Sequence, residues 1–383
     1  MIDTVSTKCS GCNLCSNICP KSAITIVNDK VLNHKPVVDT DKCIKCKLCI
    51  NSCPFITPPK KDNSFKPYAL AASSRDEQNY NGASSGGIAS SIISFGINNN
   101  YLVYASRFIN GKVAFSRINN RDEALFARGS KYVYSNPGEI YKEIKNEVKN
   151  NKVIFIGTPC QCYAIKTIVP KPFKDNLLTV DLVCHGTPSF EFLDLYLKSK
   201  EINANELNNI SFRDGHSFEI KITDKNNSVL VKEMARFDPY YLLFMRCSSF
   251  QNGCYSCNFA QKERFSDLTL GDYWEIKAED KNKFAKDKRI SVVMVSSEKG
   301  KEMINSLSDL VESYETDLDY ASSVNPQLHS HSEKNKDYFG LDKYFKSINN
   351  PTFKKALKRT SIPFTIKKNK FKYFVKTKIL RKK

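Results

Sequence analysis

The spacing of apolar residues along the chain predicts a protein of mixed α and β structure. Short apolar runs typical of buried strands occur at residues 153–156 and 177–183, residues 68–72 form a candidate strand, and residues 101–109 and 112–117 are predicted to form a hairpin. Segments with helical periodicity lie between or after them, at residues 86–97, 138–150 and 189–199. Because strands and helices alternate, we expect an α/β or α+β fold in which at least one pair of strands is parallel.

In the first 58 residues, cysteines rather than apolar runs set the pattern. Two runs share one spacing: Cys9-x2-Cys12-x2-Cys15-x3-Cys19-Pro20 and Cys43-x2-Cys46-x2-Cys49-x3-Cys53-Pro54. Between them we expect short strands at residues 23–27 and 35–39, joined through a turn at Asn28-Asp29. The spacing is that of bacterial ferredoxins with two 4Fe–4S clusters.

The spacing also predicts how the eight cysteines are shared. Three thiolates with two residues between each pair wrap one cubane, and the fourth, after three intervening residues, points to the other cubane. The first cluster is therefore expected on Cys9, Cys12, Cys15 and Cys53, and the second on Cys43, Cys46, Cys49 and Cys19. A pair of zinc knuckles is the alternative, and the duplicated run with its following proline disfavours it.

Composition changes divide the chain into five segments. We expect a two-cluster ferredoxin domain at residues 1–58, a linker at 59–67, two regions of the body at 68–150 and 151–340, and a basic helical tail at 341–383. The first ten residues lack the apolar stretch of a signal peptide, and no stretch is long and apolar enough for a membrane span. We therefore expect a cytoplasmic protein whose cysteines bind metal rather than form disulfides.

Small residues and turns mark two candidate ligand sites in the body. The run Ser84-Ser85-Gly86-Gly87 opens a predicted helix, where backbone N–H groups can bind phosphate, although a plain capped helix start gives the same pattern. Two Gly-Thr-Pro turns with cysteines, at residues 157–162 and 184–189, each follow a predicted strand. If those strands are parallel, both turns lie at the edge of the sheet where ligands bind.

Six cysteines lie outside the ferredoxin runs, and Cys254 and Cys257 form a Cys-x2-Cys pair among them. Such a pair needs two more soft ligands to hold a third cluster, and Cys160 and Cys184 are the best-placed partners. Other interpretations are a zinc half-site, a redox dithiol, or small cysteines that are simply buried.

Six segments of the body, in order, resemble the beta-subunit family of coenzyme F420-reducing hydrogenase and formate dehydrogenase. They are residues 84–87 (SSGG), 129–133 (GSKYV), 157–161 (GTPCQ), 181–186 (DLVCHG), the pair Cys254-x2-Cys257, and 267–272 (DLTLGD). The resemblance implies a flavin, usually FAD, and one further 4Fe–4S cluster beside it.

The resemblance also implies site residues. It assigns the third cluster to Cys160, Cys184, Cys254 and Cys257, with Cys247 or Cys162 as replacements. The implied flavin contacts are Ser84, Ser85, Gly86, Gly87, Arg128, Ser130 and Lys131. Arg128 and Lys131 would neutralise the flavin's charge, or else form ordinary surface salt bridges. His185 is the candidate proton-transfer residue because imidazole titrates near neutrality, unless it only caps the next turn.

Taken together, these features predict an iron–sulfur flavoprotein oxidoreductase that exchanges electrons with a ferredoxin or flavodoxin. Archaeal members of the family use F420 within a larger complex, whereas the fused ferredoxin domain resembles forms found in bacterial surface-polysaccharide gene sets. The hydride partner, F420 or another molecule, therefore stays open. The rival functions are a non-catalytic electron-relay subunit and a scaffold with vestigial clusters.

Charge adds one further expectation, for the tail. The chain has a net charge of +19, yet residues 351–383 hold 13 of its 59 Lys and Arg and no Asp or Glu. A helical stripe of Ile366, Phe371, Phe374, Val375 and Ile379 among these cations suits an anionic membrane surface. We therefore expect peripheral membrane association. The alternatives are a protein partner, a disordered tail and, least favoured, nucleic acid.

Overall fold

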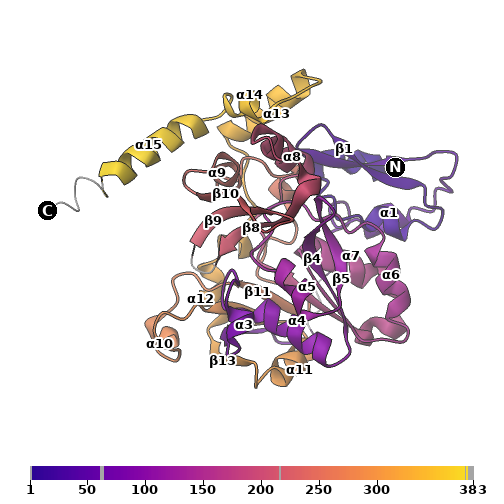
Figure 1. Cartoon of the computed structure of the whole chain (residues 1–383). Helices are drawn as coiled ribbons and strands as arrows, with labels where there is room; N and C mark the ends of the chain where they lie inside the picture. Colours follow the sequence, from indigo (N-terminus) through magenta and orange to yellow (C-terminus); the bar gives the residue numbers. More distant parts are fainter. Residues whose placement is uncertain (1, 61–63, 215–216, 376, 378–383) are drawn as a thin grey trace.

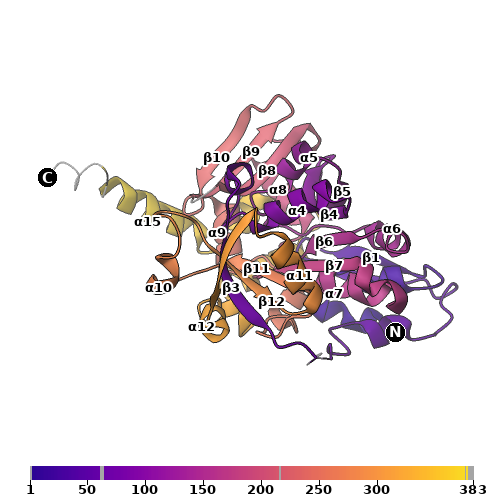
Figure 2. The same cartoon turned by 90° about the horizontal axis from the view of Figure 1, so that it is seen from below.

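A computed structural model describes residues 2–60, 64–214, 217–375 and 377. An eight-stranded sheet forms the centre of the molecule (Figures 1 and 2). In spatial order its strands are β13 (Val311–Thr316), β3 (Tyr68–Ser74), β12 (Ser291–Val295), β11 (Leu268–Asp272), β7 (Leu177–Leu182), β6 (Val153–Gly157), β4 (Leu102–Ile109) and β5 (Lys112–Ile118). The predicted α/β and α+β character is confirmed, and both predicted regions of the body contribute strands to this one sheet.

Four neighbouring strands of the sheet, β4, β6, β7 and β11, run parallel. Their carboxyl ends therefore meet at one edge of the sheet, which confirms the predicted parallel pair. The turn at Gly157 follows β6 and Cys184 follows β7, while Asp272 ends β11. Residues far apart in sequence are brought to this edge, as open α/β sheets do for their ligand sites.

Helices cover both faces of the sheet because its strands are apolar on both sides. One face is covered by α4 (Ile88–Asn98), α5 (Arg121–Phe126) and α11 (Glu298–Ser306). The other face is covered by α6 (Ile140–Glu147), α7 (Pro159–Ile168) and α12 (Leu318–Ser323). The predicted helix at 138–150 is thus shorter at both ends. Helix α7 stands where only a turn was expected, and a Thr158–Gln161 capping box starts it.

The N-terminal domain consists of short elements around the two cysteine runs. They are η1 (Ile2–Lys8), α1 (Leu14–Ile18), β1 (Ile24–Asp29), β2 (Asn33–Val38) and α2 (Leu48–Ser52). The antiparallel pair β1–β2 confirms the two predicted strands, with the turn two residues later than expected. Residues 61–63 of the predicted linker lie outside the described residues.

The N-terminal domain packs directly against the body through the loop that carries its first cysteines. The Tyr134 hydroxyl donates a hydrogen bond to the carbonyl of Gly11 at 2.6 Å, and the backbone N–H of Gly253 donates to the carbonyl of Cys9 at 3.0 Å. A Cβ at position 253 would lie 2.5 Å from the nitrogen of Ser10, so only glycine allows this approach of two backbones. The domain is seated on the body by backbone contact.

A second, three-stranded antiparallel sheet and a helical layer complete the body. The sheet contains β8 (Leu207–Asp214), β9 (Ser217–Asp224) and β10 (Val229–Met234). The helical layer contains α8 (Phe190–Ser199), α9 (Pro239–Met245), α13 (Lys336–Ser347) and α14 (Phe353–Leu357). The remaining short elements are α3 (Glu77–Tyr80), η2 (Lys171–Asn176), η3 (Ala204–Glu206), η4 (Asn252–Ser256), α10 (Ala278–Lys281) and η5 (Pro326–Leu328).

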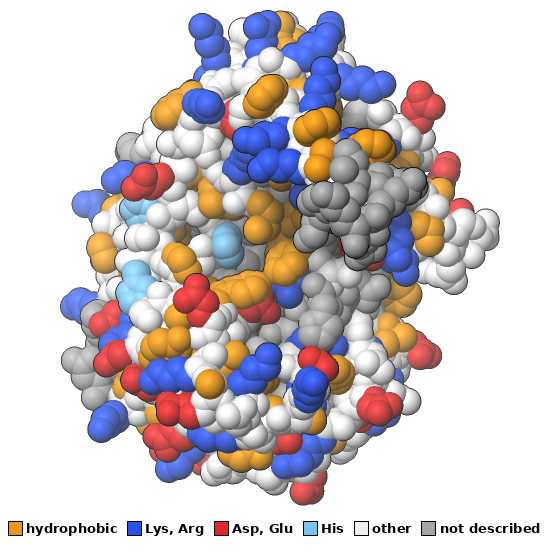
Figure 3. Space-filling view, turned by 90° about the vertical axis from the view of Figure 1, so that its left-hand side faces the viewer, with side chains coloured by type: hydrophobic (Ala, Val, Ile, Leu, Met, Phe, Trp, Pro, Cys, Tyr) orange, Lys and Arg blue, Asp and Glu red, His pale blue; other side chains and the backbone are white. Residues whose placement is uncertain are grey.

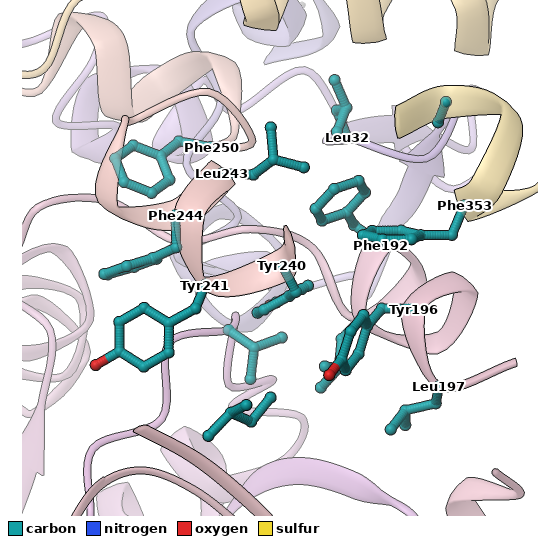
Figure 4. Close-up of a cluster of buried hydrophobic side chains, with 14 of the residues drawn as sticks. Leu32, Phe192, Tyr196, Leu197, Tyr240, Tyr241, Leu243, Phe244, Phe250 and Phe353 are labelled. Carbon is teal, nitrogen blue, oxygen red and sulfur yellow. The ribbon is translucent and has the colours of Figure 1, made fainter. Parts of the chain in front are cut away.

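The first part of the predicted tail belongs to the core. Phe353 of α14 packs against Phe192 and Tyr196 of α8, with ring centroids 5.5 and 5.4 Å apart (Figure 4). Among the described residues of the tail, it is α15 (Ile362–Phe374) that projects from the body (Figure 1). The predicted stripe is wrong in one respect: Ile366 packs against the core, whereas Phe371 is exposed. Ile379 lies outside the described residues, and no described helix is long and apolar enough to cross a bilayer.

Candidate redox centre

The structure gathers the ferredoxin cysteines into two adjoining groups. In the first cysteine group, Cys9, Cys12, Cys15 and Cys53, each thiol lies close enough to others of the group to affect their ionisation. Burial, followed by the charges of Cys53 and Cys160, raises the pKa of the Cys9 thiol to about 12. Such a thiol is protonated at neutral pH, and a bound metal is what deprotonates it.

The other four ferredoxin cysteines, Cys19, Cys43, Cys46 and Cys49, lie nearer the surface, and the predicted sharing of ligands makes them the second cysteine group. Burial raises the pKa of Cys49, and the neighbouring thiols of Cys19 and Cys46 add to the increase. Cys46 is exposed, and Cys43 and Cys19 are half-buried. Cys49 also neighbours Cys15, so the two groups adjoin.

A third cysteine group, Cys160, Cys184, Cys254 and Cys257, lies at the carboxyl edge of the main sheet. Cys160 stands in the first turn of α7, Cys184 follows β7, and the other two belong to the segment around η4. Burial raises the pKa of Cys184 to about 12, followed by the charges of Cys160 and Cys257. Burial also raises the pKa of Cys254, where the thiols of Cys184, Cys257 and Cys160 contribute.

The two replacement candidates lie in different surroundings. Cys162 is fully buried on the sheet side of α7, where its thiol contacts the carbonyl of Val180 at 3.5 Å. Burial raises the pKa of Cys247, and a hydrogen bond from Ser332 opposes the shift. Of the two, Cys162 has a thiol that neighbours Cys160 of the third cysteine group.

Among the residues that the structure describes, no set of three or more His, Cys, Asp or Glu is arranged for one metal ion. A cubane carries each thiolate on a separate iron atom, so its ligands stand farther apart than those of a mononuclear site.

Cys160 lies where the N-terminal domain meets the body. Its thiol neighbours Cys9 and Cys12 on one side, and Cys184, Cys254 and Cys257 on the other. Tyr134 stands at the same junction: burial raises the pKa of its hydroxyl, and the thiols of Cys12, Cys9 and Cys160 raise it further. The first and third cysteine groups are therefore direct neighbours, and the second group lies beyond the first.

Three arginines, Arg128, Arg213 and Arg289, donate hydrogen bonds to backbone carbonyls in or beside loop 81–87, which links α3 to α4. These three residues are called the arginine site. Arg213 of β8 donates to the carbonyl of Ser84 at 2.5 Å, and Arg128 donates to the carbonyl of Asn81 at 3.2 Å. Arg289 donates to the carbonyls of Ala83 and Tyr80. Each guanidinium keeps a buried Nε–H without a partner among the described residues. Three unused buried donors around one loop indicate a site for an anionic ligand.

A fourth cation and two hydroxyls extend the arginine site. The Lys131 ammonium donates to the carbonyl of Arg128 at 2.5 Å, and burial lowers the pKa of Lys131 to about 7. The hydroxyls of Ser84 and Ser130 are 2.7 Å apart. Within the described part of the chain, only Arg213 of these four cations forms an ion pair, with Asp272 at 3.1 Å. The site is therefore net positive.

The other residues of the predicted small-residue run serve packing. A Cβ at Gly86 would meet the carbonyl oxygen of Ala72 at 2.6 Å, and Gly87 has a φ of 83° at the N-cap of α4. The Ser85 hydroxyl donates to the carbonyl of Ile290 at 3.3 Å. These three residues seat the loop on β3 and β12, and Ser84 is the member of the run that joins the cations.

His185 directly follows Cys184 of the third cysteine group and lies near Asp272, the ion-pair partner of Arg213. Burial lowers its pKa, and the nearby carboxylate of Asp272 opposes that shift. Its Nδ1 is 3.1 Å from the side-chain nitrogen of Gln327, which fixes the ring. Asp272 pairs with Arg213, which donates to the carbonyl of Ser84, so the carboxylate near His185 is linked to loop 81–87 through Arg213. One face of the molecule is hollowed near its centre, and hydrophobic side chains lie around the hollow (Figure 3).

Comparison with known proteins relates these cysteine groups and the arginine site to a known family. Residues 150–318 match the family model of the coenzyme F420 hydrogenase/dehydrogenase beta subunit, C terminus. This match confirms the predicted resemblance to the beta-subunit family over residues 150–318. Residues 8–56 match a 4Fe-4S dicluster domain, so the beta-subunit region carries a two-cluster domain at its N-terminal side. The chain is thus an iron–sulfur redox protein related to the F420 hydrogenase beta subunit.

The chain also resembles a chain of known structure. The chain is 16% identical to a chain of the F420-reducing [NiFe] hydrogenase complex from Methanosarcina barkeri, with a TM-score of 0.46. The alignment covers 77% of this chain and 98% of that one. No curated protein matches the sequence.

Sequence reasoning missed Arg213, Arg289 and the pairing role of Asp272. The contacts of the two arginines with loop 81–87 join residues 129 and 206 positions apart. Single arginines within or beside strands carry no motif, so only the fold reveals them.

Proposed function

We propose that the chain is an iron–sulfur flavoprotein oxidoreductase that conducts electrons between a protein carrier and a flavin at loop 81–87. The observation that carries this proposal is the position of Cys160 beside both the first and the third cysteine groups. A third 4Fe–4S cluster on Cys160, Cys184, Cys254 and Cys257 would stand directly between the ferredoxin clusters and the arginine site. The resulting order of the groups is second, first, third, then loop 81–87.

The residues around loop 81–87 fit the pyrophosphate of FAD. Three guanidinium groups with unused Nε–H donors and a lysine supply four cations, and among the described residues only Arg213 is paired with an acid, Asp272. A bound flavin would supply the exchange of single electrons with clusters and of electron pairs with a substrate. His185, held by Gln327 and opposite Asp272, is the residue proposed to give or take the proton at that site. F420 is the first acceptor to test.

The surface over the second cysteine group suits an acidic electron carrier such as a ferredoxin or flavodoxin. Lys45 and Lys47 are exposed beside Cys46, and Ile44 and Leu48 are 57% and 42% exposed next to them. An apolar centre with a cationic rim is the usual make-up of a transient docking surface.

Reversing these two charges should weaken docking. In the variant Lys45→Glu/Lys47→Glu, the concentration of acidic carrier at half-maximal reduction should rise roughly tenfold at low salt. The difference should shrink as salt is added, since rim charges are screened. Stopped-flow reduction measures it, with Lys225→Glu/Lys281→Glu as a control of equal charge on exposed sites elsewhere. Equal losses in both variants would contradict a local docking surface.

Flavin affinity should depend on pH through Lys131. Because the pKa of Lys131 is lowered to about 7, its ammonium is charged below that pH and neutral above it. An anionic pyrophosphate favours the charged form, so affinity should be level below pH 7 and fall by up to roughly tenfold per pH unit above it. Fluorescence titration of flavin into stripped protein measures this. The variant Lys131→Met should bind weakly and with a flat profile; an unchanged slope would exclude Lys131.

Anaerobic purification tests the proposal as a whole. We expect a protein with about twelve iron atoms and one flavin per chain, whose flavin absorbance is bleached by dithionite and restored by an acceptor. A flavin-free protein with clusters alone would instead support the electron-relay function.

A further inference from the structure

Helix α15 has two different apolar faces, and one of them has no contact with the described part of the body. Its inner face carries Ile362, which is fully buried, and Ile366, which packs against the core. Farther along, Asn369 donates to the carbonyl of Arg236 at 2.8 Å, and the Arg236 guanidinium lies 4.9 Å from the centre of the Tyr373 ring. These contacts fix the helix as it leaves the body.

The opposite face of α15 presents phenylalanines to solvent. Phe364, Phe371 and Phe374 are 72%, 68% and 54% exposed. Phe364 and Phe371 are seven residues apart, so they lie on the same side of the helix, two turns from each other. Large exposed apolar side chains aligned along a helix mark a surface that is covered when the protein works.

The phenylalanine face is surrounded by positive charge alone. Lys367, Lys368, Lys370 and Lys372 are all exposed on the same helix. The sequence from 351 to 383 contains no acidic residue. An apolar groove on a protein partner could cover the phenylalanine rings. That partner would also need acidic residues to pair with the four surrounding lysines. An anionic bilayer surface takes the rings among its acyl chains and the lysines among its headgroups.

We propose that α15 docks the protein on an anionic membrane surface, with Phe364, Phe371 and Phe374 inserted at the interface. The helix and the N-terminal domain lie at opposite ends of the molecule in both cartoon views (Figures 1 and 2). A protein attached through α15 therefore keeps the surface over the second cysteine group open to a soluble electron carrier. The attachment does not depend on the third cluster or on the flavin.

Vesicle co-sedimentation of the full-length holoprotein tests the proposal. We expect binding to vesicles of phosphatidylcholine with phosphatidylglycerol, and little binding to phosphatidylcholine alone. Added salt should weaken it, because each lysine near the surface contributes a factor of roughly five. The variant Phe364→Ser/Phe371→Ser/Phe374→Ser should lower binding at least about tenfold, since it removes three interfacial aromatic side chains.

A control variant tests whether the effect is specific to the phenylalanines of α15 or follows the loss of any exposed phenylalanine. Phe339 of α13 is 58% exposed, so Phe339→Ser should leave binding unchanged. Point substitutions are preferable to deleting residues 351–383, which would remove the buried Phe353 and Ile362. Equal iron content in all variants shows that the fold is intact. The proposal is overturned if the triple variant binds vesicles as well as the parent, or if the phenylalanines are instead required for binding a single-stranded oligonucleotide or for self-association.

Discussion

Replacing Cys254 by alanine should remove about four of about twelve iron atoms per chain and leave the other eight in place. The thiol of Cys254 neighbours Cys184, Cys257 and Cys160, all of which belong to the body. The ferredoxin cysteines have their own small apolar core, which includes Ile2, Val5 and Ile24. Loss of one ligand should therefore empty the third site alone. Iron analysis and electron paramagnetic resonance of the reduced protein measure the result.

Two control variants make this test specific. Cys162→Ala and Cys247→Ala should each keep all the iron, because Cys162 faces the sheet core and Cys247 neighbours Ser332. If Cys247→Ala loses four irons and Cys254→Ala does not, the ligand set of the third cluster is different from the one proposed. Loss of all iron in Cys254→Ala would instead show that the N-terminal clusters depend on the third site for their stability.

The Cys254→Ala variant should also block electron transfer from the ferredoxin clusters to the flavin. With the third site empty, an acidic carrier should still reduce the ferredoxin clusters, whereas the flavin absorbance should stay unbleached. Dithionite, which can reach an exposed flavin directly, should still bleach it. A flavin that the carrier reduces at the normal rate would show that the third cysteine group is not on the route.

The sequence was informative where chemistry is encoded by local spacing. The two cysteine runs fix three ligands of each ferredoxin cluster within seven residues, so their pattern is readable without a fold. The strands at β3, β4, β6 and β7 were also predicted, because each is a short, largely buried apolar run.

The sequence was silent where function depends on long-range contacts. The contact between the N-terminal domain and the body includes the Tyr134–Gly11 hydrogen bond, which joins residues 123 positions apart. The cation site needs Arg213 and Arg289, neither of which belongs to a motif. In the tail, helical periodicity grouped Ile366 with Phe371, although packing against the body turns Ile366 inward. Periodicity finds apolar residues on a helix, but only the neighbouring elements decide which of them are covered.

Replacing Gly253 by alanine should disturb the seat of the N-terminal domain and slow electron transfer into the body. The new Cβ would lie 2.5 Å from the nitrogen of Ser10 and 2.6 Å from the carbonyl carbon of Cys9. These are backbone atoms on both sides, so no side chain can rotate away, and overpacking of this kind typically costs about 1–3 kcal/mol. The first cysteine group is the part of the N-terminal domain that must shift.

The matched control for this substitution is Gly138→Ala. Gly138 has a φ of 51°, but no described heavy atom lies within 4 Å of the position that a Cβ would take, so the same methyl group meets open space there. Gly253→Ala should keep about twelve irons and its flavin, yet a carrier should bleach that flavin more slowly than in the parent or the control. Because each redox group remains bound, slower bleaching would indicate a longer distance between Cys9 and Cys160 rather than a missing cofactor. Bleaching at the parent's rate would show that contact between the two domains at Gly253 does not govern the electron route.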